Sequence, residues 1–139
     1  MITKKDFVRI MHTQSKIALA TSANNLPNVR IVNFYFEEQT NTMFFATFRN
    51  NDKVKEFEIN SNIAFTTIPD QGNEHVKARG TVQKSKRTIF DVAAGFTNKM
   101  PDYKETIEQA GESLVLFEIK FITATVTLDF ENIANITLK

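Results

Sequence analysis

Cysteine and tryptophan are absent from this chain of 139 residues, and glycine and proline are scarce, at four and three residues. The lack of cysteine excludes a disulfide framework, a thiolate metal site and a cysteine nucleophile, and it is typical of a reducing compartment. The two histidines, His12 and His75, lie far apart in the sequence, so we expect no multi-histidine metal centre.

Long apolar runs and an excess of either charge are also missing. The first residues, Met-Ile-Thr-Lys-Lys-Asp-Phe, are not followed by an apolar stretch, and no segment approaches the ~20 apolar residues of a membrane helix. With 17 basic and 16 acidic residues the formal net charge is +1, which provides no field to attract nucleic acid or an anionic membrane. The densest basic cluster, residues 84–87, fits a solvated turn. We therefore expect a cytoplasmic protein with no membrane or nucleic-acid partner.

Sequence motifs of several enzyme classes are missing too. The chain contains no G-x-G-x-x-G, no P-loop, no H-E-x-x-H and no G-x-S-x-G. Without a thiol, a metal cluster or a catalytic triad, any redox chemistry must come from a bound organic cofactor. The length predicts a single domain over residues 1–139.

What is present centres on two apolar runs, residues 28–36 and 42–48, which predict an antiparallel pair of strands because they are rich in β-branched and aromatic side chains. The period of two places Arg30 on the same face as Val32 and Phe34, so it is a lone cation among large apolar neighbours. Such a cation needs an anionic partner.

A helix is predicted from Asp52 to about Ile59, with Asn50, Asn51 and Asp52 as N-cap candidates. Lys53 then lies in the first helical turn, where free backbone N–H groups and the positive end of the helix dipole favour a phosphate. Arg30 and Lys53 could share one anion. The alternative is a surface salt bridge for Arg30 and a solvated helix charge for Lys53.

The remaining pattern predicts a mainly β domain. A helix is expected over residues 3–12, strands over 16–21, 63–68, 75–84, 113–121 and 123–130, and helices over 85–95 and 102–111, with a loop at 97–101. Residues 131–139 are interpreted as a tail or a strand that completes a partner. This order describes an antiparallel β-barrel of about seven strands with three or four short helices at its connections.

The strand from His75 to Lys84 alternates cleanly between apolar and polar residues. Its polar face, formed by residues 75, 77, 79 and 81, should border water, a cofactor or another subunit. Gly80 on the same strand indicates a bulge or the close approach of another backbone.

Three motifs carry a resemblance to a known family. Arg-Ile-Val-Asn at 30–33, Phe-Phe-Ala-Thr at 44–47, and Lys53 six residues beyond Thr47 occur in order, and Glu-Phe-Glu-Ile-Asn-Ser-Asn-Ile-Ala-Phe-Thr-Thr follows at 56–67. Over about residues 16–82 the chain resembles the FMN-binding split β-barrel of the pyridoxamine 5′-phosphate oxidase-like proteins, in their small general-stress branch. The resemblance implies an FMN cofactor and a homodimer with the cofactor sites at its interface.

The resemblance also implies cofactor-binding residues. Arg30 and Lys53 correspond to phosphate contacts, and His75 lies where the oxidase has a glutamine that reaches the flavin. The other matching positions line two strands beside the cofactor and are Ile31, Val32, Asn33, Ala46 and Thr47. His75 is equally well explained as a surface histidine of a strand.

Two departures limit what can be carried over. Asp52 stands where the oxidase has an arginine, and a carboxylate there would repel a phosphate. The oxidase's C-terminal tryptophan and arginine motif is missing, so pyridoxamine phosphate is not assigned as substrate. The resulting hypothesis is an FMN-dependent oxidoreductase with unknown substrate and unknown catalytic residues. The alternatives are a flavin-binding or flavin-sequestering protein without turnover, and a relative that binds haem or a deazaflavin.

Overall fold

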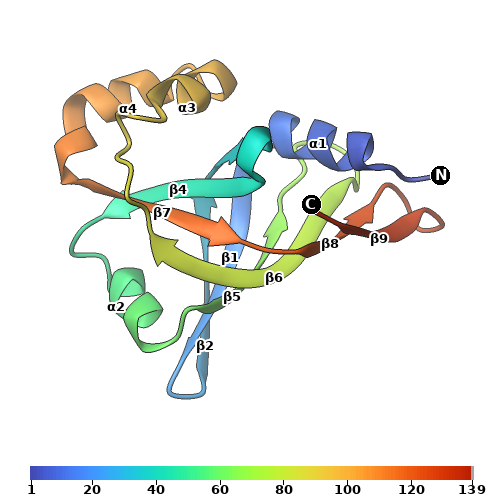
Figure 1. Ribbon diagram of the computed structural model, residues 1–139, viewed down its shortest axis with the longest axis horizontal. Helices are drawn as coiled ribbons and strands as arrows, with labels where there is room; N and C mark the ends of the chain where they lie inside the picture. Colours follow the sequence, from blue (N-terminus) through green and yellow to red (C-terminus); the bar gives the residue numbers. More distant parts are fainter. Residues whose placement is uncertain (139) are drawn as a thin grey trace.

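The computed structural model describes residues 1–138 and arranges their nine strands in one antiparallel sheet (Figure 1). The strands are Lys16–Ala23 (β1), Leu26–Asn33 (β2), Tyr35–Glu37 (β3), Thr42–Phe48 (β4), Asn62–Thr67 (β5), His75–Lys84 (β6), Leu114–Lys120 (β7), Thr123–Thr127 (β8) and Ile133–Thr137 (β9). The α-helices are Lys4–Thr13 (α1), Asp52–Ile59 (α2), Ala93–Lys99 (α3) and Tyr103–Ala110 (α4), with short 3-10 helices at Glu38–Thr40 (η1) and Gly111–Ser113 (η2).

The sheet curls into a barrel that hydrogen bonds do not close. Its strand order is β2-β1-β5-β6-β7-β4-β3, and β8 pairs with β6 and β9 with β8. β2 and β3 are consecutive in sequence but lie at the two ends of this path. The Phe34 N–H still bonds the carbonyl of Ser15 in register with the β1–β2 ladder, and from Tyr35 onward the chain pairs with β4 instead. The prediction of a mainly β, antiparallel split barrel with short helices is confirmed.

Two hydrophobic clusters hold the fold together. The larger fills the inside of the barrel, with α1 contributing Phe7 and α2 contributing Phe57 from two different sides. The smaller lies on the outer surface of β4 and β7, where Phe44 and Leu116 are covered by α3 and α4. The two faces of β4 therefore meet different environments, and its residues alternate between them.

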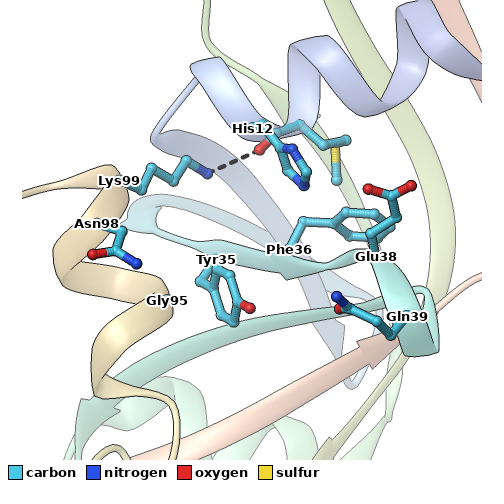
Figure 2. A pocket seen from close by; sticks show the side chains of 9 residues that line it. His12, Tyr35, Phe36, Glu38, Gln39, Gly95, Asn98 and Lys99 are labelled. Atoms are coloured by element: carbon cyan, nitrogen blue, oxygen red, sulfur yellow. Dashed lines mark hydrogen bonds between the residues drawn. The ribbon is translucent and has the colours of Figure 1, made fainter.

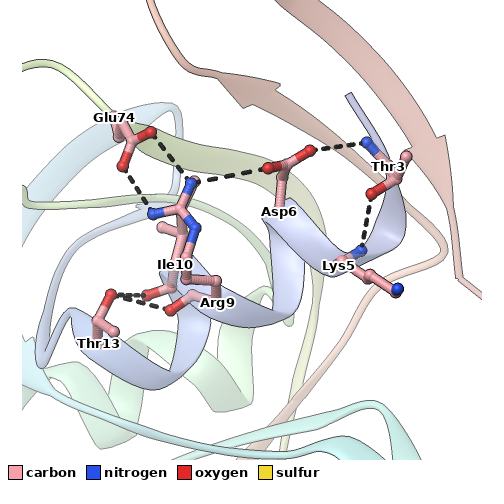
Figure 3. A network of polar contacts seen from close by, with 7 residues as sticks. All are labelled: Thr3, Lys5, Asp6, Arg9, Ile10, Thr13 and Glu74. Carbon is pink, nitrogen blue, oxygen red and sulfur yellow. Dashed lines mark hydrogen bonds and ion pairs between the residues drawn. The ribbon is translucent and has the colours of Figure 1, made fainter. Parts of the chain in front are cut away.

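The helix α1 is capped at its start and is tied to the loop before β6 from its middle (Figure 3). Thr3 caps it, with the reciprocal bonds of a capping box to Asp6. Arg9 makes two parallel hydrogen bonds to the carboxylate of Glu74, at 2.8 and 3.0 Å, in the loop before β6. This bidentate pair ties the helix to the rest of the barrel.

Several local predictions are confirmed. The turn between β1 and β2 places Asn24 and Asn25 at positive φ, 54° and 64°, as the asparagine pair indicated. α2 and β6 have the predicted bounds. A Cβ on Gly80 would lie 2.3 Å from the carbonyl oxygen of Lys120, so the close approach of another backbone does explain this glycine.

The helix predicted over residues 85–95 is wrong for residues 85–92, and the loop predicted at 97–101 is wrong for residues 97–99. α3 begins at Ala93, and Gly95 lies inside it. Ser85 does not cap a helix, because its hydroxyl bonds Glu118 at 2.7 Å across the sheet. The chain then turns locally where Thr88 N–H donates to the Asp91 carboxylate at 2.8 Å. Competition from these side-chain bonds explains why the apolar spacing of residues 89–93 does not form a helix.

Two predictions about strand pairing also need correction. Residues 28–36 are not one strand paired with 42–48, because β2 pairs with β1 and only β3 pairs with β4. The segment 131–139 is neither a tail nor a strand for a partner over its described part, since β9 pairs with β8 of the same chain. The last residue, 139, lies outside the described part.

Candidate functional site

The carboxylate of Glu56 on α2 is the centre of a polar cluster at the α2 end of the barrel. Arg30 of β2 forms an ion pair with it, and both side chains are only 18% exposed. Arg30 also donates to the Thr21 hydroxyl at 2.7 Å, and that hydroxyl donates to Glu56 at 3.3 Å. Asn28 completes the cluster with a long bond of 3.5 Å to the second carboxylate oxygen. The anionic partner that Arg30 needs is thus supplied by the chain itself.

Lys53 lies one turn earlier on α2 and is buried. Its Nζ donates to the hydroxyl of Thr47 on β4 at 2.9 Å. Burial lowers the pKa of Lys53, and the nearby positive charge of Arg30 lowers it further, while Glu56 acts in the opposite direction. Because Arg30 pairs with Glu56, three residues after Lys53 on α2, the two cations lie near the same part of this helix.

The cluster carries two positive charges and one negative charge. Lys53 has three N–H donors, and within residues 1–138 the hydrogen bond to Thr47 is the one its ammonium makes. A buried ammonium with one hydrogen bond has N–H donors left over, and a bound anion would provide acceptors for them. The residues present therefore fit the phosphate of a nucleotide cofactor, with Glu56 as a competitor for Arg30.

The N-cap of α2 is Asn51, whose side chain accepts from the Lys53 N–H at 3.1 Å. Asp52 is the first helical residue and is exposed. Its carboxylate is therefore placed at the positive end of the helix dipole without serving as the cap. The cap itself occupies one of the backbone N–H groups that the sequence offered to a phosphate.

Other residues proposed from the resemblance are spread over different surfaces. Ile31 is 64% exposed on the outer face of β2, whereas Val32 packs against the barrel core and Asn33 is half-buried. Ala46 faces away from Lys53, into the cluster beneath α3 and α4, because it neighbours Thr47 on a strand.

His75 is on the opposite face of the sheet from Arg30. Arg30 stands opposite buried Leu19, which places it on the inner face, whereas the inner residue at the start of β6 is Val76. The Nδ1 of His75 lies 2.7 Å from the carbonyl oxygen of Asn73. A carbonyl only accepts, so Nδ1 is the protonated nitrogen in this bond. One chain therefore does not bring His75 to the cluster of Arg30 and Lys53.

The outer face of β6 and β8 is hollowed into two adjoining concavities. One, of about 440 Å³, is lined by His75 and Lys77 and flanked by Phe130 and Ile133 of the β8–β9 hairpin. The other, of about 570 Å³, includes Lys77 and Arg79. The β6 side chains on this face are polar, as the alternation of the strand predicted.

Thr21, Asn28 and Glu56 were not among the residues predicted for the site. Glu56 follows Lys53 by three positions on α2, so helical spacing already places the two on one face. Thr21 stands opposite Asn28 in the register of the hairpin and on the same face as Arg30, which counting outward from the asparagine turn predicts. Both signals were available in the sequence.

Comparison with known families decides the relationship of the chain. The model of the "Pyridoxamine 5'-phosphate oxidase-like" family matches residues 10–133. The chain belongs to this family. The resemblance drawn from the sequence motifs is thereby confirmed, while no curated protein sequence matched the chain.

Solved structures of this pyridoxamine 5′-phosphate oxidase-like fold are similar at low sequence identity. General Stress Protein 26 from Bacillus anthracis str. Sterne is 17% identical with a TM-score of 0.72, covering 96% of this chain and 98% of that one. The haem storage protein HutZ from Vibrio cholerae is 14% identical with a TM-score of 0.67, covering 87% and 91%.

A haem-binding protein from Mycobacterium smegmatis is 8% identical with a TM-score of 0.77 over 99% of this chain. The chain spans 59% of that protein's length. These similarities show the fold, and they include proteins named for haem as well as a general stress protein.

Residues 1–138 lack two further features. No helix in this part of the chain has the length and apolar content needed to span a membrane. No group of three or more His, Cys, Asp or Glu side chains within it could hold a metal ion.

Proposed function

We propose that this chain binds FMN, with the phosphate held by Arg30 and Lys53, and that it is an FMN-dependent oxidoreductase. The observation that carries the proposal is the convergence of these two cations with Thr47 at one end of the barrel. Charge-assisted bonds from a guanidinium and an ammonium are the strongest contacts that side chains offer a phosphate. When bound, FMN supplies hydride-transfer chemistry that no group of the chain provides.

The residues of the chain have distinct tasks in this proposal. Lys53 is oriented by Thr47 and contributes an ammonium in a site from which water is largely excluded. Arg30 is held by Thr21 and must be shared between the phosphate and Glu56. Glu56 thus sets how strongly the site prefers a dianion, because it cancels one of the two positive charges.

A homodimer is part of the same proposal. The outer face of β6 carries His75, Lys77 and Arg79, and polar and basic side chains suit an interface only when they gain partners. A second copy seated on this face could bring its own inner-face cluster to the His75 of the first. Flavin binding and dimerisation should then be linked.

Fluorescence titration of folded variants with FMN and with riboflavin tests the phosphate site. We expect Arg30→Ala and Lys53→Ala to lose FMN affinity by about 1.5–3 kcal/mol and riboflavin affinity by much less, because riboflavin lacks the phosphate. Lys55→Ala, which removes an exposed lysine of the same helix, is the matched control and should leave both affinities unchanged. Equal losses for the two ligands would remove Arg30 and Lys53 from the phosphate site.

Anaerobic addition of NADH or NADPH to the FMN-loaded protein then tests turnover. Bleaching of the flavin at a useful rate supports an oxidoreductase. Bound FMN that is not reduced by either nucleotide favours a flavin carrier instead, and would contradict the enzymatic part of the proposal.

Haem is the second candidate, and a feature of His75 favours it. Because Nδ1 donates to Asn73, His75 could hold a haem iron through Nε2 beside a concavity lined by Lys77 and Phe130. Two similar structures are named for haem binding or storage. A Soret band on adding haem that His75→Ala abolishes, without FMN binding, would favour this candidate over the flavin.

A further inference from the structure

A separate pocket lies between α1, β3 with η1, and α3, on a different part of the molecule from the cluster around Glu56 (Figure 2). Its volume is about 330 Å³. Its lining includes side chains that can exchange protons or form hydrogen bonds, among them His12, Tyr35, Glu38, Asn98 and Lys99. Neither the phosphate site nor the outer face of β6 uses any of them.

Lys99, the last residue of α3, has unusual surroundings for a lysine. Its Nζ donates to the backbone carbonyls of Met11 and Phe34, each at 3.0 Å, and lies 3.4 Å from the centroid of the Phe34 ring. Within residues 1–138 no carboxylate lies within ion-pair distance of it. The ammonium is stabilised only by carbonyl dipoles and a ring face.

Burial is the sole cause that lowers the pKa of Lys99, to about 7. The titratable groups that face it from the packed elements are His12 on α1, Tyr35 on β3 and Glu38 on η1. A substantial share of Lys99 is therefore a neutral amine at neutral pH, and a neutral amine is a nucleophile. An exposed lysine with an ordinary pKa near 10.4 is almost wholly protonated there.

Tyr35 lines the same pocket, and its ring is fixed in place. A Cβ on Gly95 would come within 2.3 Å of its ring, so the ring lies directly on the helix backbone. Phe96 holds it from one side at a centroid distance of 5.7 Å, and Phe44 stacks at 6.2 Å. Burial first, and then the charge of Glu37, raises the pKa of Tyr35, so its hydroxyl stays a hydrogen-bond donor.

We propose that Lys99 is a covalent binding site for small aldehydes or ketones, which it takes as an imine in this pocket. The Nζ lone pair attacks the carbonyl carbon, and the carbonyl π electrons move to oxygen. A proton passes from nitrogen to that oxygen to give a carbinolamine. The carbinolamine then loses its hydroxyl, with one proton, as water, and the C=N bond forms. No oxidant or reductant is required, and hydrolysis reverses each step.

The surrounding groups suit these steps. Tyr35 and His12 line the same pocket as Lys99. In this proposal the Tyr35 hydroxyl donates to the carbonyl oxygen, and His12 gives and takes the protons of the dehydration. The contact of Nζ with the Phe34 ring is strongest for the ammonium. Loss of the proton weakens that contact and leaves the amine free to turn toward the pocket.

Reductive labelling of the unmodified protein tests this proposal. The protein is treated with limiting butanal and sodium cyanoborohydride between pH 6 and pH 10, and each lysine is quantified by peptide mass spectrometry. At pH 7 we expect Lys99 to be labelled at least tenfold faster than exposed lysines such as Lys4 and Lys104, because its neutral fraction is larger. The advantage should shrink toward pH 10 as the others deprotonate.

Two variants sharpen the result. Tyr35→Phe should slow labelling of Lys99 several-fold without changing that of Lys104. Lys99→Arg keeps a cation at the position and should abolish the rapid phase at pH 7. Labelling at pH 7 that falls on the exposed lysines and spares Lys99 would overturn the proposal, and this outcome needs no variant to fold.

Discussion

The carboxylate of Glu56 would compete with a ligand phosphate for Arg30. The carboxylate pairs with Arg30 and accepts from Thr21 and Asn28, so it is held firmly rather than by a single contact. The site predicted from the sequence contained the two cations but not this third charge. The charge of a site, and not only its shape, depends on such neighbours.

Glu56→Gln should therefore tighten FMN binding about tenfold, since it removes roughly 1.4 kcal/mol of competing attraction and repulsion. The apo protein should become less stable, because Arg30 and Lys53 then lose the negative charge between them. Fluorescence titration and thermal melts measure both effects. Glu58→Gln, at an exposed position on the same helix, is the control and should change neither. Unchanged or weaker FMN binding in Glu56→Gln would contradict a phosphate site at Arg30.

Lys99 makes stability depend on pH in a direction that can be worked out. Its folded-state pKa of about 7 lies below the ordinary value, so between these values the unfolded chain binds more protons than the folded chain. The free energy of unfolding should then rise with pH above 7, by up to about 1.4 kcal/mol per pH unit. Below pH 7 both states hold the proton, and the penalty is complete.

Urea denaturation of the unmodified protein and of Lys99→Met between pH 6 and pH 10 measures this contribution. The difference between the two curves isolates Lys99 from the other titrating groups. We expect Lys99→Met to be relatively more stable at pH 6 than at pH 9.5. A difference that stays constant across the range would mean that Lys99 keeps an ordinary pKa.

At the scale of elements, α3 contains a glycine that the sequence pattern assigned to a helix end. Gly95 instead lies inside the helix, under the ring of Tyr35. Helix propensity alone favours Gly95→Ala by about 1 kcal/mol. The added Cβ would meet the ring at 2.3 Å, closer than any real contact, so packing opposes the change.

We expect Gly95→Ala to lower the free energy of unfolding, because overpacking costs about 1–3 kcal/mol and exceeds the gain in propensity. The same change in a Tyr35→Ala background should be neutral or stabilising, since the ring is no longer there. The double-mutant cycle by chemical denaturation reports this coupling directly. Additive effects would show that the ring does not hold α3.

At the scale of the whole molecule, one face of the sheet is left uncovered by the other elements of residues 1–138. A row of outward residues crosses four strands, from Ile31 through Ala18 and Thr66 to Lys77. Its β2 end is apolar, with Val29 and Ile31 exposed at 63% and 64%, and its β6 end is basic. A face with small side chains in the middle and apolar side chains at one end suits contact with a second copy of the chain.

We expect a dimer by sedimentation at micromolar concentration. Ile31→Glu should weaken it at least tenfold by placing a charge in the apolar end of the interface. Ile59→Glu, which changes an equally exposed isoleucine on α2, should leave the dimer intact. A monomer that still binds FMN would refute both the dimer and its link to the cofactor.

The sequence by itself determined features that depend on near neighbours along the chain. Backbone preferences and the periods of 2 and 3.6 residues explain the capping box at Thr3, the asparagine turn and the alternation of β6. The spacing of Lys53 from Thr47 is likewise read directly along the chain. These local rules were enough to identify the family, because its motifs are short and their order is linear.

Only the tertiary structure decided what depends on contacts distant in sequence. It paired β2 with β1, folded β9 back on β8, set Glu56 against Arg30 and turned His75 to the other face of the sheet. A strand has two edges and two faces, and alternation assigns residues to faces without saying what each face or edge will meet. That choice is made by hydrogen bonds and burial across the whole barrel.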